Sequence, residues 1–264
     1  MTTTPSTDHT VHTVHRADPP TQPRRLLGVW AHPDDEAYLS AAMMARVTDS
    51  GGSVTVVTAT RGEQGTSDEG HRGTAAFGAL REAELRASLA ELGVTDLRVL
   101  GLPDGALPEV DADEPVAVIA ATIAEVDPDV VVTFGPDGIT WHPDHRTVSG
   151  WTTRACAESG RTSALLYAAM TDDFAAHHAE RHARAGLFAD WGPGHPATVA
   201  RSDVALECAM SPGELARKRR ALGRHASQIG EVVGTFGEQG YLEWLNQETF
   251  RRPTAAELGM GAVR

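Results

Sequence analysis

The sequence predicts an α/β fold: a Rossmann-like, doubly wound and mostly parallel sheet with helices on both faces. Short apolar runs rich in β-branched residues alternate along the chain with segments of helical period. The apolar runs lack polar alternation, which is typical of strands buried on both faces. A chain of 264 residues is also long enough to bury a sizeable core. We therefore expect parallel strands joined by right-handed helical crossovers.

Five apolar runs are predicted to be strands. The run at 53–59, SVTVVTA, has the strongest β-branched character. The run at 129–134, DVVVTF, follows an Asp-Pro pair that ends the segment before it. In chain order the predicted strands are 26–31, 53–59, 97–102, 129–134 and 163–168.

Helical segments are predicted between these strands. The clearest covers 75–92, because leucines recur at near-helical spacing from Leu80 to Leu92 and Gly93 follows its end. The others begin or end at similar signals, such as the glycine pair after residue 50. The predicted helices are 36–50, 75–92, 115–126 and 143–159.

The chain after residue 169 has weaker patterns. Residues 170–196 fit a helix followed by a loop rich in glycine and proline. His178 and His182 would share one face of that helix, and we interpret them as solvated, because no strand-end carboxylates accompany them as they would at a metal site. Residues 214–226 form a basic helix containing the only lysine, Lys218, and we expect its charges to face solvent.

Residues 1–24 are polar and rich in threonine and proline, so we predict a disordered tail followed by a single domain at 25–264. No apolar stretch approaches the roughly 20 residues of a membrane span, and the N-terminus lacks the apolar region of a secretory signal. Cys156 and Cys208 are far apart and suggest no disulfide framework. These features predict a cytoplasmic protein.

The acidic charge balance limits the partners. The formal net charge is −13, and an acidic chain repels phosphate backbones and anionic lipid surfaces. We therefore expect no nucleic-acid partner and no membrane partner, but a small-molecule substrate. No oligomeric state is predicted.

Two clusters of His and Asp side chains directly follow predicted strands. The first reads AHPDDE at 31–36, and the second reads WHPDH at 141–145. Ligands of open parallel sheets bind beyond the carboxyl ends of the strands, so the clusters would face each other if their strands are neighbours. The proline in each cluster restricts the histidine before it to extended geometry.

Imidazole nitrogens and carboxylate oxygens are the ligands of a catalytic zinc ion, which has three protein ligands and an open position for water. The pKa of zinc-bound water is about 7, so a neighbouring carboxylate can act as a general base. Of the adjacent Asp34 and Asp35, one could bind the metal while the other faces the water. The alternative is that both clusters are ordinary polar loops that cap helices. Because both clusters lie at strand ends, the metal site is the favoured interpretation.

The pair AHPDDE and HPDH resembles the PIG-L/LmbE-like zinc N-deacetylases. This family includes N-acetylglucosaminylphosphatidylinositol deacetylases and the bacterial deacetylases of mycothiol and bacillithiol synthesis. The resemblance extends over most of the chain, from about residue 25 to about residue 230. Weaker agreements accompany the paired motif: TRGE at 60–63, REAEL at 81–85, DG at 104–105 and SQ at 227–228.

The resemblance implies a metal site and a base. His32, Asp35 and His145 would bind one zinc ion per chain. Asp34 would be the general base that activates the water.

The resemblance also implies supporting residues. His142 would stabilise the oxyanion, protonate the leaving amine, or both, and Asp144 would orient a histidine. Arg81 and Asp104 match substrate-contacting positions of some members, although Arg81 could equally form a salt bridge on a helix surface. Some members have an oxyanion-assisting tyrosine where this chain has Thr140, so the zinc ion and His142 would carry more of that stabilisation.

The predicted function is a zinc-dependent hydrolase that removes an N-acetyl (acyl) group from an amino-sugar derivative, by attack of metal-bound water with Asp34 as base. One alternative is a divalent-metal phosphoryl-transfer or phosphatase-like site, which would leave the histidines unused. Another is a non-catalytic homologue that binds a sugar or a metal ion. A mycothiol-pathway sugar, a natural-product glycoside and a general N-acetylglucosamine derivative are all compatible substrates.

Overall fold

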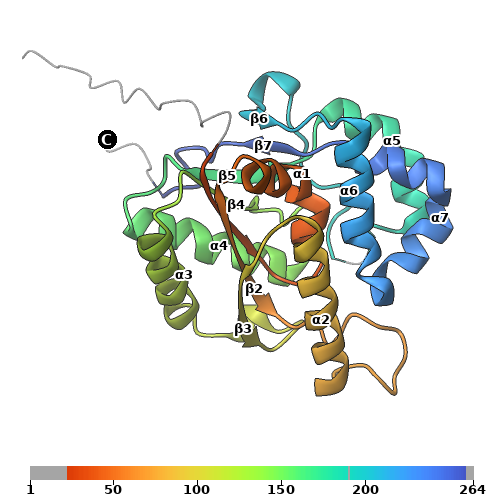
Figure 1. Cartoon of the computed structure of the whole chain (residues 1–264), viewed down its shortest axis with the longest axis horizontal. Helices are drawn as coiled ribbons and strands as arrows, with labels where there is room; N and C mark the ends of the chain where they lie inside the picture. Colours follow the sequence, from red (N-terminus) through yellow and green to blue (C-terminus); the bar gives the residue numbers. More distant parts are fainter. Residues whose placement is uncertain (1–22, 190, 260–264) are drawn as a thin grey trace, which may run out of the picture.

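A single seven-stranded sheet organises the computed structural model, which describes residues 23–189 and 191–259. Its strand order is β3-β2-β1-β4-β5-β7-β6 (Figure 1). Strands β1 to β5 are parallel, and β7 runs antiparallel to both of its neighbours. The strands are β1 Arg25–Trp30, β2 Ser53–Thr60, β3 Asp96–Leu102, β4 Val130–Phe134, β5 Leu165–Ala169, β6 Leu206–Glu207 and β7 Thr249–Arg251.

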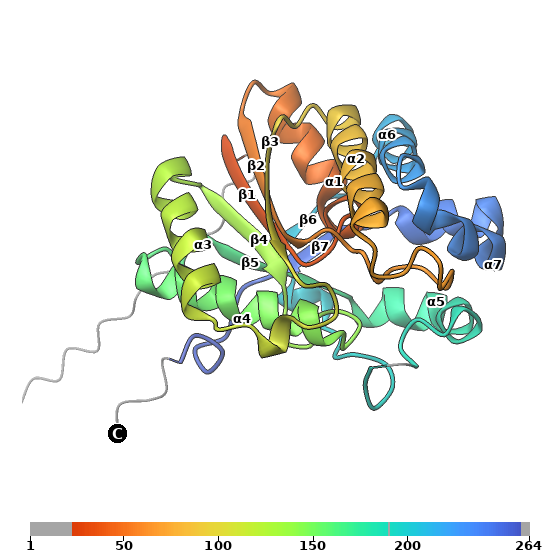
Figure 2. The same cartoon turned by 90° about the horizontal axis from the view of Figure 1, so that it is seen from below.

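Helices cover both faces of the sheet, which confirms the predicted fold class (Figure 2). One face carries α1, α2 and α6, and the other carries α3 and α4; α7 packs against α5 and α6. The helices are α1 Asp35–Asp49, α2 Ala75–Glu91, α3 Asp113–Val126, α4 Pro143–Glu158, α5 Asp172–Ala185, α6 Pro212–Gly223 and α7 Ala226–Leu245, with short 3₁₀ turns at Leu107–Glu109 and Arg201–Asp203.

The predicted strands and helices up to residue 169 agree with the structure to within two residues at each end. The predicted tail at 1–24 falls almost entirely outside the described residues. Cys156 and Cys208 are free and buried. Within 23–189 and 191–259, no helix combines the length and the apolar character needed to cross a membrane.

Strands β1 and β4 lie side by side at the centre of the sheet, with Leu26 opposite Val130. Near their carboxyl ends the indole of Trp30 packs edge-on against the ring of Phe134, with centroids 5.1 Å apart. Gly28 leaves room for that indole, since a Cβ there would lie 2.7 Å from its Nε1. After β1 the chain turns to the face of α1, and after β4 to the face of α4. This divergence creates the crevice in which open α/β sheets bind ligands.

A buried ion pair ties α6 and the segment before β7 to α1. The Lys218 Nζ lies 3.0 Å from the Glu248 Oε1 and donates to the Tyr38 carbonyl at 2.6 Å. Glu248 also accepts the backbone N–H groups of Ala42 and Met43. In a regular helix the Ala42 N–H donates to the Tyr38 carbonyl. Glu248 and Lys218 contact these same two backbone groups, so the ion pair lies beside one backbone hydrogen bond of α1. The expectation that every charge of the basic helix faces solvent is therefore wrong, because Lys218 is fully buried.

Replacing Lys218 with alanine should lower the free energy of unfolding by about 3–5 kcal/mol, because Glu248 would stay buried without its partner. Chemical denaturation measures the change. The matched control is Arg220→Ala, which removes an exposed pair with Glu91 and should cost less than about 1 kcal/mol. Equal losses in the two variants would contradict a structural role for the buried pair.

Candidate active site

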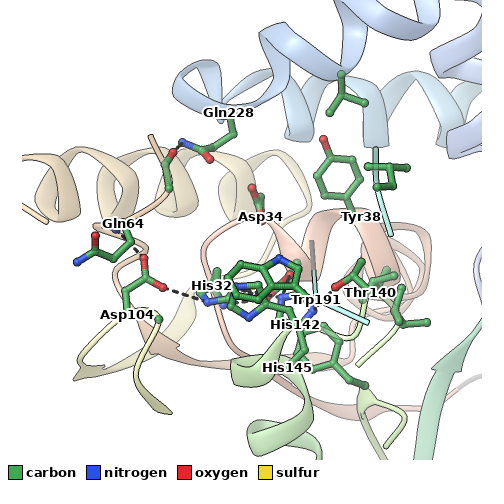
Figure 3. Close-up of a pocket in the computed structure, with 18 of the residues that line it drawn as sticks. His32, Asp34, Tyr38, Gln64, Asp104, Thr140, His142, His145, Trp191 and Gln228 are labelled. Atoms are coloured by element: carbon green, nitrogen blue, oxygen red, sulfur yellow. Dashed lines mark hydrogen bonds and ion pairs between the residues drawn. The ribbon is translucent and has the colours of Figure 1, made fainter. Parts of the chain in front are cut away.

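A cavity of about 770 Å³ opens beyond the carboxyl ends of β1 and β4, and both His/Asp clusters line it (Figure 3). This volume lies in the range of small-molecule sites. Asp144 is fully buried behind the wall. The predicted site residues that line the cavity are His32, Asp34, Asp35, Arg81, Asp104, His142 and His145.

Two imidazole rings meet at the centre of the site. The His32 Nδ1 lies 3.1 Å from the His145 Nε2. The His145 Nδ1 lies 2.9 Å from the Gly138 carbonyl, and the His32 Nε2 lies 3.1 Å from carboxylate oxygens of Asp104 and Asp144. With both rings neutral, these contacts place the N–H protons on the outer nitrogens, so that the inner nitrogens would face each other as two lone pairs. Lone pairs this close repel each other unless a positive charge lies between them.

Asp35 supplies a third electron-pair donor to the same point. Its Oδ1 lies 3.4 Å from the His145 Nε2, and its Oδ2 lies 3.8 Å from the His32 Nδ1. The Oδ2 also accepts the His32 backbone N–H at 2.7 Å, which holds the carboxylate in place. Three converging donors of this kind fit a divalent cation. The donor nitrogens of His32, His142 and His145 also lie within 4.8 Å of one another.

The electrostatics of the cluster favour one positive charge. Burial opposes protonation of His32, but hydrogen bonds with Asp104 and Asp144 outweigh it and raise its pKa to about 10. Burial lowers the pKa values of His142 and His145 to about 3, and the charge on His32 contributes to both shifts. The three rings therefore stabilise a single positive charge among them, either a proton on His32 or a bound cation.

Asp34 holds a strained position at the start of α1. Its φ is 110°, and among the described residues its side chain caps no helical N–H. The carboxylate instead reaches into the cavity above His32 (Figure 3). Left-handed backbone at a non-glycine residue costs about 1–3 kcal/mol and is typical of functional sites. Burial raises the pKa of Asp34 to about 6, although the charge of Arg81 opposes the shift.

Arg81 is buried beneath the loop after β2, so its placement on a helix surface is wrong. Its guanidinium donates to the carbonyls of Gly62 and Pro33, at 2.9 and 2.6 Å, and to the Asp34 carboxylate at 3.2 Å. A Cβ at Gly62 would lie 2.1 Å from the Arg81 Nη1, so the loop needs glycine there. A substrate contact for Arg81 or Asp104 stays a prediction; here Arg81 orients Asp34, and Asp104 contacts His32.

His142 and Asp144 occupy the start of α4. The His142 Nδ1 accepts the Asp144 backbone N–H at 3.2 Å, which leaves Nε2 as the nitrogen able to exchange a proton. The Asp144 carboxylate accepts the N–H groups of Gly105 and Leu107 and lies beside the His32 Nε2. Such contacts orient a ligand histidine.

The hydroxyl of Thr140 lies on the outer side of His145, 3.3 Å from Nδ1. It therefore does not take the place of the tyrosine found in some members of the family. Tyr38 also lines the cavity, but its hydroxyl bonds that of Tyr241 at 3.2 Å.

A buried pair that the sequence analysis did not predict lies behind Asp34. Glu36 is fully buried and accepts the Asp34 backbone N–H at 3.0 Å. The His225 Nε2 lies 3.5 Å from the Glu36 Oε1. Burial opposes charge on His225, but its interaction with Glu36 outweighs it and raises the pKa. The two adjacent acids before Glu36 could have indicated a cluster of buried carboxylates. No local pattern indicates a role for His225, which lies at the junction of α6 and α7.

The interpretation of His178 and His182 as solvated is wrong, because both side chains are buried. The His182 Nε2 accepts the indole N–H of Trp244 at 3.0 Å, and the His178 Nδ1 lies 3.0 Å from an Arg181 nitrogen. Their role is packing between α5 and α7.

Comparisons with known proteins identify similar sequences and a similar fold. The family model described as "GlcNAc-PI de-N-acetylase", of the PIG-L family, matches residues 27–156. A 1D-myo-inositol 2-acetamido-2-deoxy-alpha-D-glucopyranoside deacetylase of Rhodococcus erythropolis is 34% identical over 241 residues, which cover 78% of this chain and 81% of that protein.

A deacetylase of the same name from Streptomyces avermitilis is 41% identical over 148 residues, 46% of this chain and 49% of that one. The chain thus spans about half the length of several of its curated relatives. The solved N,N'-diacetylchitobiose deacetylase of Pyrococcus horikoshii has a TM-score of 0.61 at 19% identity, covering 88% of this chain and 85% of that chain, and it shares the fold.

Replacing His145 with alanine should weaken metal binding by more than about 100-fold, because the remaining donors cannot enclose a cation. Asp144→Asn should weaken it by about 10–100-fold, since Asp144 contacts the outer nitrogen of His32 and orients the ring. Metal content after dialysis and titration calorimetry measure both effects. The control is His177→Ala on the exposed side of α5; unchanged metal affinity in His145→Ala would refute the ligand set.

Proposed function

The chain belongs to the PIG-L family of de-N-acetylases, and we propose that it is a metal-dependent hydrolase that removes an N-acyl group from an amino-sugar derivative. The observation that carries the proposal is the convergence of the His32, His145 and Asp35 donors beneath the carboxylate of Asp34. Two imidazole nitrogens with one carboxylate favour Zn²⁺, one ion per chain, over Mg²⁺, which prefers oxygen ligands. The same preference argues against the phosphoryl-transfer alternative.

When bound, the cation supplies Lewis acidity, which polarises an amide carbonyl and makes water more acidic. Asp34 accepts a proton from the water molecule whose oxygen attacks the carbonyl carbon. Its pKa of about 6 leaves it ionised, and therefore basic, at neutral pH. Arg81 and the strained backbone hold the carboxylate in the cavity, so little reorganisation is needed during the attack.

His142 acts on the carbonyl oxygen. Its pKa of about 3 leaves the ring neutral, and through the Nε2–H it donates a hydrogen bond to the developing oxyanion. The proton that Asp34 accepts from the water passes to the nitrogen as the C–N bond breaks. The Asp144 carboxylate, at the start of the same helix, keeps His32 oriented. We propose that the residues of the site belong to one domain at 25–264. We also propose that the substrate is a small amino-sugar molecule.

Replacing Asp34 with asparagine should reduce kcat by about 10²–10⁴-fold while metal stays bound, because the variant lacks only the proton acceptor. Carboxylate release from N-acyl glucosamine derivatives by zinc-loaded protein measures turnover. The control is Asp49→Asn at the far end of α1, which bonds Arg217 at the surface. If Asp34→Asn keeps more than a tenth of the wild-type rate, Asp34 is not the base.

A further inference from the structure

The cavity has two halves of opposite chemical character, on either side of the metal-ligand residues (Figure 3). Gln64, Asp104 and Gln228 lie on one side of His32, and Tyr38 lies on the other. We call these the polar half and the apolar half. On the side of Tyr38, the apolar half comprises Leu39, Ile139, Met170, Leu187, Phe188, Val232 and Trp244. Thr140 lies on the same side, with its hydroxyl 3.3 Å from the His145 Nδ1.

The apolar half is continuous. A second cavity of about 80 Å³ shares Tyr38, Leu39, Ile139, Met170 and Trp244 with the main one, so these side chains lie together. Further apolar side chains support the wall from behind. Val232 and Trp244 pack with a cluster that includes Tyr241 and Leu245 of α7. Leu187 and Phe188, which follow α5, pack with Met170.

The polar atoms of this half already have protein partners. The hydroxyl of Tyr38 bonds that of Tyr241, and the indole N–H of Trp244 donates to the His182 Nε2. The Tyr38 and Trp244 rings pack edge to face, with centroids 5.6 Å apart. A sugar hydroxyl placed against these rings would lose hydrogen bonds to water without gaining equivalent ones.

The polar half offers the hydrogen-bonding groups that a sugar needs. Gln228 is fixed by a bond from its Nε2 to the Gly65 carbonyl at 3.1 Å, and Asp104 by the Gln64 backbone N–H at 2.7 Å. Arg72 also lines the cavity and is exposed. Amide, carboxylate and guanidinium groups are suited to hydroxyl recognition.

The scissile amide must lie between the halves. A trans amide sends its two substituents in opposite directions from the C–N bond. With the carbonyl at the metal ligands and the sugar in the polar half, the acyl chain points into the apolar half. On the basis of the proposed hydrolysis, we propose that the group removed by this enzyme is an apolar acyl chain longer than acetyl.

Most of the apolar half lies outside residues 27–156, the part matched by the family model. Met170, Leu187, Phe188, Val232 and Trp244 all follow that part. The proposed acyl preference therefore depends mostly on segments that follow the part matched by the family model.

The test uses N-acetyl, N-butanoyl, N-hexanoyl and N-octanoyl glucosamine with zinc-loaded protein. The value of kcat/KM should rise about fourfold for each methylene that becomes buried, until the apolar half is filled. A parallel series of alkyl glycosides of N-acetylglucosamine should stay flat. A flat or falling acyl series overturns the proposal, as does a rise in the glycoside series, which would put the aglycone in the apolar half. Hydrolysis of none of the compounds would instead refute the proposed function itself.

A variant separates chain recognition from catalysis. Val232→Trp should fill the apolar half and reduce the hexanoyl-to-acetyl ratio of kcat/KM at least tenfold. The matched control is Val118→Trp on α3, an exposed valine outside the cavity, which should leave the ratio unchanged. Metal content and thermal midpoint verify that both variants are folded. If Val232→Trp is folded and keeps the wild-type ratio, the apolar half does not receive the acyl chain.

Discussion

Strands β1 and β4 are neighbours in parallel register, and the chain leaves their ends toward opposite faces of the sheet. The Trp30–Phe134 contact holds the two ends together, so the loops beyond them must share one small space. His32 comes from one loop and His145 from the helix after the other, and their inner nitrogens lie 3.1 Å apart. This enforced approach requires a positive charge between the two rings, either a proton or a cation, and the Asp35 carboxylate lies beside both nitrogens.

Helix α1 carries residues of the proposed catalytic site and of the apolar half of the cavity. Asp34 and Asp35 stand at its start, and one turn later Tyr38 belongs to the apolar wall. The buried Lys218–Glu248 pair holds the helix at that same turn. The proposed base, the proposed metal ligand and a residue of the apolar half therefore lie on one packed helix, so a change in its packing would move all three.

Local patterns were sufficient for the parallel strands, the first four helices and both His/Asp clusters, because each depends on neighbouring residues. They were insufficient where a partner is distant in the chain. The buried state of Glu36 depends on His225, and that of His182 on Trp244. The left-handed geometry at Asp34 was also not predicted; it is accompanied by an ion pair with the distant Arg81 and by a local hydrogen bond to Glu36.

The single lysine gives the protein an unusual chemical profile. Lys218 is the only lysine in the sequence, and its side chain is 1% exposed. Amine-reactive reagents therefore find no accessible side-chain amine on the folded molecule and are left with any α-amino group. Acylation of Lys218 requires α6 to separate from α1, so its rate reports that local opening directly. The fold thus contains its own site-specific probe of how often α6 separates from α1, the helix that carries Tyr38 of the cavity wall.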